Sequence, residues 1–346
     1  MTEMWSRAAA PSALALLLAF GAPASVVPAS AAPQVDHYVG VCDASAAVAL
    51  DATHFIVGED EHDVLLVYRR GAAQPVGRVD LVDVLGNRRK NGKPREADIE
   101  GAARIGDRIY WIASHSRDGG GDAEPTRHRL FATDVVGGGP LPTVTPVGVP
   151  YIGLLADLLA ATQRNPALAA LDLAQAARLP PESPEGLNIE GLAAAPDGTL
   201  LIAFRNPRPA GQALLLPLTN AAALVRGDGP ARFGAPILLD LGQRGIRSIE
   251  RVGEGYVLVA GPHDDGGRRP GGDFALYRWS GPGTQPEQMA VDLGSLNPEA
   301  VFQTLDVARL YLLSDDGGEK VDGHACKDKK VPAARKSFRG MALPLP

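Results

Sequence analysis

The chain has 346 residues, a net charge of -6 and an aromatic content of 5%. Nucleic-acid-binding proteins carry a basic stripe for the phosphates and aromatic side chains on which bases stack. The sequence has neither feature, so nucleic acid is not an expected partner. The low aromatic content also argues against an extended polysaccharide-binding surface.

Residues 1–31 predict a secretory signal peptide. Arg7 precedes an apolar stretch at 13–20, and Ala29-Ser30-Ala31 has the small residues that signal peptidase prefers. The apolar stretch is too short to span a bilayer stably, and no later stretch is long enough. We therefore expect cleavage near Ala31-Ala32, a mature domain over 32–346 in the periplasm or outside the cell, and no membrane span.

A short pattern recurs along the mature chain: a small polar residue, a branched or cyclic residue, then glutamate. The copies are CDAS at 42–45, which is degenerate, DIEG at 98–101, NIEG at 188–191, SIER at 248–251 and NPEA at 297–300. Four short strands can be assigned to each repeat, which predicts an all-β fold, a β-propeller of five four-stranded blades. Six blades stay possible if one repeat lacks the acid, whereas a β-sandwich would not place one acid at the same point of every sheet.

The strands after each motif are apolar segments that end in polar residues. The expected second strands begin at His54, Ile109, Leu200, Tyr256 and Leu310. The expected fourth strands are RVDLVDV from Arg78, APILLDL from Ala235 and EQMAVDL from Glu287. The segment HYVGVC, near the mature N-terminus, is expected to form the outer strand of the last blade.

Between Tyr151 and Pro181 the apolar period changes from that of a strand to that of a helix. Leucines at 154, 155, 158 and 159 form one stripe. A second helix is expected to begin at Asn165, a favourable cap, with Pro166 in its first turn. The sequence thus predicts an αα-hairpin over 151–181, inserted at one end of the propeller.

The chain has two cysteines, Cys42 and Cys326. In an oxidising compartment they are expected to form a disulfide that links the first and last blades. Two separate thiols are the alternative. Their spacing does not suit a redox or zinc motif.

The motif acids are expected to converge on the propeller axis. If each innermost strand starts at its motif, the motif residues and the ends of the second strands lie on one face. The expected metal ligands around the axis are Asp43, Glu100, Glu190, Glu250 and Glu299. The substrate-binding residues expected around the mouth are Asn188, Arg205, Asn206 and Asp315.

Several carboxylates around one axis repel one another, because unit charges about 8 Å apart at an effective dielectric near 20 cost roughly 2 kcal/mol per pair. A calcium ion, which prefers oxygen ligands, is one solution. Raised carboxyl pKa values are a second solution, and Arg205 or Arg247 reaching inward is a third. Alternatively, each acid has a structural role and accepts backbone hydrogen bonds from the next blade.

The run LNIEGLAAAPDGTLLIAFRNP at 187–207, together with the other motifs and FRGMAL near the end, resembles a secreted bacterial propeller family of unknown function. That family is similar to phytase-like propellers labelled "esterase-like activity of phytase". The resemblance covers about residues 39–345 and implies a propeller outside the cytoplasm. The phytase link implies calcium-assisted phosphoester hydrolysis with Glu100, Glu190, Glu250 and Glu299 near the metal.

Two classes of function follow. In the first, the protein is a calcium-assisted hydrolase of a small anionic phosphoester or a lactone, with Glu190 or Glu100 activating water. Arg205 would bind the substrate; the alternative is that it pairs with Glu190. His115 would be a general base; the alternative is that it is only a solvated loop residue. In the second, a monomeric propeller without catalytic activity binds a ligand or a protein on the same face.

Overall fold

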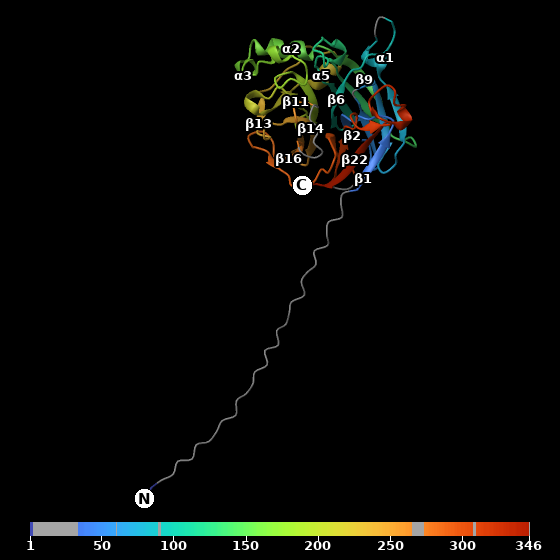
Figure 1. Cartoon of the computed structure of the whole chain (residues 1–346). Helices are drawn as coiled ribbons and strands as arrows, with labels where there is room; N and C mark the ends of the chain where they lie inside the picture. Colours follow the sequence, from blue (N-terminus) through green and yellow to red (C-terminus); the bar gives the residue numbers. More distant parts are fainter. Residues whose placement is uncertain (3–33, 60, 89–90, 265–272, 307–308, 346) are drawn as a thin grey trace. The chain divides into compact units, whose positions relative to one another are not determined.

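Five four-stranded antiparallel sheets surround a common axis in the computed structural model, which describes residues 1–2, 34–59, 61–88, 91–264, 273–306 and 309–345 (Figure 1). The predicted five-bladed β-propeller is confirmed.

Blade 1 contains β2 (Ala46–Ala49), β3 (His54–Gly58), β4 (Val64–Arg69) and β5 (Pro75–Asp80). Blade 2 contains β6 (Ile99–Ile105), β7 (Arg108–Ala113), β8 (Leu130–Val136) and β9 (Thr143–Tyr151). Blade 3 contains β10 (Asn188–Ala194), β11 (Leu200–Asn206), β12 (Ala213–Leu218) and β13 (Ile237–Leu239).

The last two blades follow the same order from the axis outward. Blade 4 contains β14 (Gly245–Val252), β15 (Gly255–Gly261), β16 (Ala275–Trp279) and β17 (Glu287–Gln288). Blade 5 contains β18 (Pro298–Gln303), β19 (Arg309–Ser314), β22 (Ser337–Pro344) and β1 (Val35–Val39). A small hairpin of β20 (Lys320–Val321) and β21 (His324–Ala325) extends the β19–β22 connection.

The N-terminal strand closes the ring. As predicted, β1 pairs with the C-terminal β22, with Tyr38 opposite Phe338. The innermost strands β2, β6, β10, β14 and β18 each contact the next around the axis, and β18 contacts β2. One hydrophobic cluster fills each of the five blade interfaces. The cluster between blades 5 and 1 is rich in aromatic residues. Phe55 packs edge-on against Tyr38, and their ring centroids are 5.1 Å apart.

The glycine of the motif is explained by close packing of neighbouring inner strands. A Cβ on Gly101 would lie 2.9 Å from the backbone carbon of Gly191, and a Cβ on Gly191 would lie 3.2 Å from Ile249. The first contact is too short for a side chain and the second is tight, so the DIEG and NIEG glycines let three inner strands approach one another.

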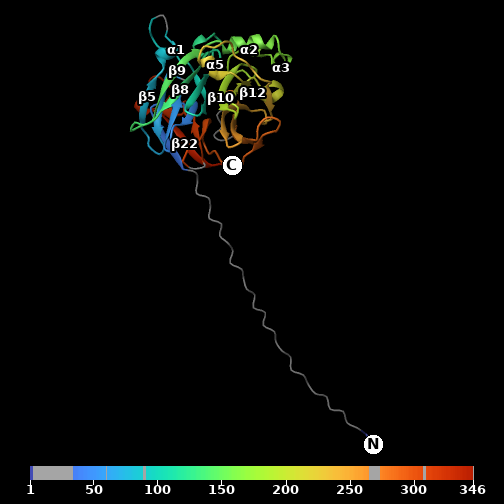
Figure 2. The same cartoon turned by 180° about the vertical axis from the view of Figure 1, so that it is seen from behind.

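The insert between β9 and β10 contains three helices rather than the two that were predicted. They are α2 (Leu154–Thr162), α3 (Pro166–Ala169) and α4 (Leu173–Ala176). Asn165 caps α3 as expected, because its side chain accepts a hydrogen bond from the amide of Ala167. Asp172 has a left-handed φ of 48°, which separates α3 from α4. Figures 1 and 2 show α2 and α3 on the side of the blades opposite the C-terminus.

Some short elements were not foreseen. The segment RVDLVDV divides into the end of β5 and α1 (Val82–Leu85), because the strand ends at Asp80. Helix α5 (Ala221–Val225) follows β12, and the 3-10 turns are η1 (Pro125–Arg127), η2 (Pro209–Gly211) and η3 (Ala333–Arg335). The predicted signal peptide lies outside the described residues, apart from Met1 and Thr2. Among the described residues, no helix is long and apolar enough to cross a membrane.

Candidate functional site

A β-bulge in four of the five inner strands, β6, β10, β14 and β18, determines which residue faces the axis at one end of the propeller. The register shifts in β6, β10 and β18 fall at Glu100, Glu190 and Glu299. In β14 the shift falls at Arg247, between Ile246 and Ser248. Because a bulge redirects a side chain, Arg247 takes the place in blade 4 that glutamate takes in the other three.

These residues line a polar pocket of about 170 Å³, which we call the axial pocket. In blade 1 the lining residue is Ser45, which directly precedes β2. The described residues that line the pocket are Ser45, Asp98, Glu100, Ser116, Gly119, Arg127, Pro181, Glu182, Asn188, Glu190, Arg205, Arg247, Glu299, Asp315 and Lys327. They include six carboxylates and four basic side chains, so acidic groups are in excess.

Glu250 does not join this group, which corrects the expectation of an acidic ring that includes it. It follows Arg247 by three residues, or about 10 Å along a strand. It lines a separate pocket of about 280 Å³, the lower pocket, whose described lining is Val48, Ala103, Arg104, Ala194, Glu250, Arg251, Gly253 and Gln303. The distance in sequence to the next strand could have revealed this. Glu100 precedes Ile109, the start of its second strand, by nine residues. In blade 4 Arg247 precedes Tyr256 by nine residues, whereas Glu250 precedes it by six.

The Glu250 carboxyl should make stability depend on pH. Burial raises its pKa to about 7, against the hydrogen bonds from the amides of Gln303 and Arg251. A raised carboxyl pKa means that the folded state favours the protonated form, so ionisation destabilises the fold as the pH rises from about 4.5 to 7. Glu250→Gln should therefore stabilise the protein at pH 8, by at most about 3 kcal/mol, and much less at pH 5. Equal effects on the melting temperature at both pH values would contradict this assignment.

Two arginines bind the acids of the axial pocket. Arg205 Nη1 lies 2.9 Å from Glu190 Oε1, and Arg247 Nε lies 2.7 Å from Glu190 Oε2. Arg247 Nη2 also pairs with Glu299 Oε1. All four side chains are buried. Of the three expected solutions to carboxylate repulsion, the inward-facing arginines are therefore present, and Arg205 forms the pair with Glu190 that was the alternative to substrate binding.

The same geometry does not fit a calcium ion between the axial acids. Both oxygens of Glu190 are engaged, since Oε1 also accepts a hydrogen bond from Asn188 Nδ2 at 2.8 Å. The Arg247 guanidinium bridges Glu190 and Glu299, so between these two acids it already supplies the positive charge that calcium would supply. Calcium binding by Glu100, Glu190, Glu250, Glu299 and Asp43 stays an untested prediction that these contacts do not support.

Asp98 and Arg127 form another pair at the pocket wall. Arg127 Nη1 lies 3.0 Å from Asp98 Oδ2. Burial lowers the pKa of Arg127, but the nearby Asp98, Glu96 and Glu100 outweigh it and the pKa is raised. Arg127 thus stays charged. Glu100 is partly exposed to solvent, whereas Glu190 and Glu299 are buried.

Asn188 presents a buried acceptor at the pocket. The residue is 5% exposed, and its Nδ2 donates to Glu190. Its Oδ1 has no hydrogen-bond partner in the described part of the chain. A buried acceptor without a partner is costly, so this oxygen is a place where a ligand donor would be favourable.

Asp43 and Asn206 do not line the axial pocket, contrary to expectation. Asp43 is buried and packs closely against Gly317: a Cβ added to Gly317 would lie 2.2 Å from Asp43 Oδ1. Asn206 is fully buried, and its Nδ2 donates to the carbonyl oxygens of Pro181 and His263, both at 2.9 Å. Asn206 therefore anchors the end of the insert, which places Pro181 and Glu182 at the pocket.

His115 is not placed to act as a general base. It is 2% exposed, has a φ of 55° and does not line the axial pocket. Burial lowers its pKa to about 3, so the ring is neutral at neutral pH. The Nδ1 atom lies 2.8 Å from the carbonyl oxygen of Ala113, and the ring stacks on His128 at 5.6 Å. Strand alternation could not reveal this, because His115 lies beyond the end of β7 and has a left-handed φ.

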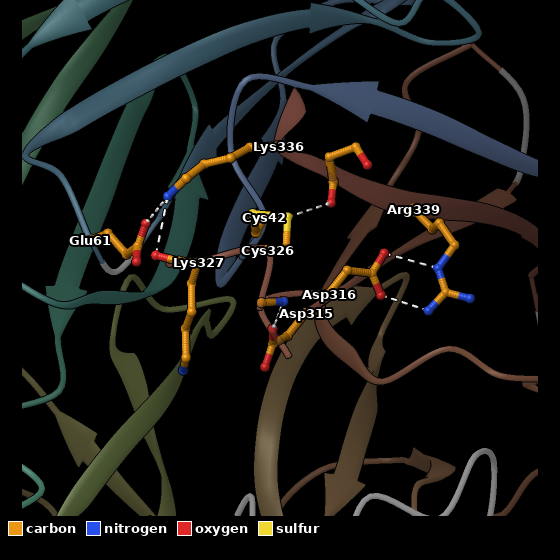
Figure 3. The surroundings of a disulfide bond; sticks show 10 residues. Cys42, Glu61, Asp315, Asp316, Cys326, Lys327, Lys336 and Arg339 are labelled. Atoms are coloured by element: carbon orange, nitrogen blue, oxygen red, sulfur yellow. Dashed lines mark hydrogen bonds and ion pairs between the residues drawn. A yellow bond between two sulfur atoms is a disulfide. The ribbon is translucent and has the colours of Figure 1, made fainter. Parts of the chain in front are cut away.

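The disulfide holds a basic side chain at the axial pocket. Cys42 and Cys326 are bonded, with a Cα–Cα distance of 5.9 Å, which confirms the predicted link. Lys327 follows Cys326 and lines the pocket, while Lys336 pairs with Glu61 at 2.8 Å. Figure 3 shows the Lys327 ammonium directed away from that pair. Asp315, a predicted site residue, also lines the pocket, and its Oδ1 accepts a hydrogen bond from the amide of Gly317 at 2.7 Å.

Sequence comparison gives one family match. A model described as "Protein of unknown function (DUF3616)" matches residues 157–308, from the insert to the middle of blade 5. A search of curated proteins found no match.

Solved structures resemble the chain at low identity. A putative glucose dehydrogenase from Thermus thermophilus has 12% identity and a TM-score of 0.40, over 90% of this chain and 100% of that one. The Cps50 (Swd1) propeller domain of Myceliophthora thermophila has 9% identity and a TM-score of 0.39, over 90% and 100%. The GH43 BlXynB protein of Bacillus licheniformis has 10% identity and a TM-score of 0.42, over 81% of this chain, which spans half the length of that protein.

Proposed function

We propose that this chain is a ligand-binding propeller whose axial pocket holds a small molecule that bears an ammonium group. The observation that carries the proposal is the buried Oδ1 of Asn188, an acceptor without a protein partner in the described structure, beside an excess of carboxylates. An ammonium group has three donors and no acceptor, which complements such a lining. The volume of about 170 Å³ limits the group to a small one.

An anionic ligand, which the sequence favoured, is less well matched. Arg205 and Arg247 already pair with Glu190 and Glu299, so a phosphate would have to displace those carboxylates. The paired charges are also buried and held in place, which suits a preorganised binding site.

A location outside the cytoplasm is part of this proposal. Disulfides persist in oxidising compartments, and the Cys42–Cys326 bond joins two fully buried cysteines across the ring closure. The signal peptide predicted for residues 1–31 supports the same location.

Hydrolysis is the second candidate, and the partial exposure of Glu100 favours it. This carboxylate could activate water against a phosphoester or a lactone beside Arg127. The calcium-assisted form implied by the phytase-like resemblance is not adopted, because Arg247 occupies the centre between Glu190 and Glu299.

Calorimetric titration of the mature protein tests the proposal. Alanine amide should bind, whereas acetate and inorganic phosphate should not. Glu100→Gln should weaken alanine amide binding about tenfold, because it removes one nearby negative charge. Glu250→Gln is the matched control, since it makes the same change in the lower pocket and should leave binding unchanged.

Two results would contradict the proposal. The first is tighter binding of phosphate or acetate than of alanine amide. The second is turnover of phosphoester or lactone substrates that is abolished by Glu100→Gln, which would favour the hydrolase.

A further inference from the structure

A second, larger pocket lies beside the axial pocket. It has a volume of about 520 Å³, and we call it the rim pocket. Its described lining residues are Gly40, Glu61, His62, Pro94, Arg95, Glu96, Asp118, Glu124, Lys329, Val331, Ala333 and Lys336.

Three chain segments contribute to both pockets. Glu96 lines the rim pocket and Asp98 the axial pocket, two residues apart. Asp118 lines the rim pocket, and the next residue, Gly119, lines the axial pocket. Lys329 lines the rim pocket and Lys327 the axial pocket. The two pockets are therefore neighbours along one continuous wall.

Arg127 stands at the boundary between them. Its guanidinium pairs with Asp98 on the axial side and with Glu96 on the rim side. It also donates from Nη1 to Ser116 Oγ at 3.1 Å. Its Nε–H has no acceptor among the described residues, and its side chain is 13% exposed. At the boundary, the Arg127 guanidinium is thus held in place by its ion pairs, and its Nε–H could donate to a ligand.

The rim pocket differs in chemistry from the axial pocket. Its charges are largely paired, with Arg95 bound to Glu124 and Lys336 bound to Glu61. Pro94, Val331 and Ala333 add small apolar surfaces. The described lining contains no Phe, Tyr or Trp on which a sugar ring could stack, which favours a peptide over an oligosaccharide.

We propose that the two pockets together bind the amino terminus of a peptide, an inference that rests on the proposed ammonium site. The terminal ammonium enters the axial pocket, near Asn188 and Glu100. The first peptide carbonyl accepts a hydrogen bond from Arg127 Nε. The following residues occupy the rim pocket, where their small side chains contact Val331 and Ala333.

Three soluble probes test this by calorimetric titration of the mature protein: alanine amide, tetra-alanine amide and N-acetyl-tetra-alanine amide. Tetra-alanine amide should bind at least about tenfold more tightly than alanine amide, because it fills both pockets. The acetylated peptide should not bind, because it lacks the ammonium group.

Two matched variants localise the effect. Ala333→Trp should fill the rim pocket and bring tetra-alanine amide to the affinity of alanine amide. Ala334→Trp, at the neighbouring exposed position outside the pocket lining, should retain the tenfold difference. Alanine amide should bind equally to both variants and to the unsubstituted protein.

The outcomes separate the two proposals. Equal binding of alanine amide and tetra-alanine amide to the unsubstituted protein would overturn the peptide inference and leave the ammonium site in place. Failure of every amine to bind would overturn both. A gain in affinity with a tetramer of glucosamine, and not with tetra-alanine amide, would replace the peptide by an oligosaccharide.

Discussion

Replacing Glu190 by glutamine is expected to lower the free energy of unfolding by about 3–5 kcal/mol, because it removes the negative charge that two buried arginines share. Glu190 is 4% exposed and binds both Arg205 and Arg247. Glutamine preserves the size of the side chain but cannot balance two guanidinium groups. Chemical denaturation of the mature protein measures the loss.

Glu287→Gln is the matched control for this experiment. Glu287 pairs with Arg278 at 2.8 Å, but both side chains are more than half exposed. Exposed ion pairs contribute about 0–1 kcal/mol, so this variant should unfold almost as the unsubstituted protein does. A Glu190→Gln protein as stable as this control would contradict the proposed charge pairing.

Removing the disulfide is expected to have the second largest effect. The double variant Cys42→Ala and Cys326→Ala should lose about 2–5 kcal/mol of stability. The bond closes a loop across a sequence separation of 284 residues, and it ties the segment after β1 to the connection between β19 and β22. Alanine is chosen because both cysteines are 1% exposed, so a serine hydroxyl would be buried.

Reduction provides an internal check on this second prediction. A reducing agent should destabilise the unsubstituted protein by a similar amount and should leave the double variant unchanged. Hydrogen exchange should show earlier opening of β1, which among the described strands pairs only with β22. If the double variant unfolds at the same denaturant concentration as the parent, the disulfide does not stabilise the ring closure.

The blades could be predicted from the sequence because each repeat has its own apolar strands. The closing strand and the disulfide followed from that repeat, since a ring brings the two ends of the chain together. The axial pocket could be predicted in part, because its lining includes Glu100, Asn188, Glu190, Arg205, Glu299 and Asp315, which were expected around the axis. The rim pocket could not be predicted, because its wall comes from connections between strands, which have no periodic pattern. The bulges could not be predicted either. The SIER motif resembles the others and placed Glu250 at the axis, but the register shift in β14 falls at Arg247.

Side-chain partners were harder to predict than strand positions. The sequence placed Glu190 and Arg205 on one face, but it left open whether arginine bound a substrate or an acid. The structure resolves this through Arg247, whose distance from Glu190 depends on the bulge in β14. His115 shows the same limit, because it stacks on His128 within the irregular connection between β7 and β8.

The central claim is that an arginine, and not a metal ion, balances the axial carboxylates. Its most direct test is a double-mutant cycle of Glu190→Gln and Arg247→Gln, measured by chemical denaturation in excess EDTA and again in excess calcium. The account predicts a coupling free energy of about 1–3 kcal/mol that is the same in both solutions. A coupling near zero in EDTA, together with a calcium-dependent rise in the stability of the unsubstituted protein, would contradict it.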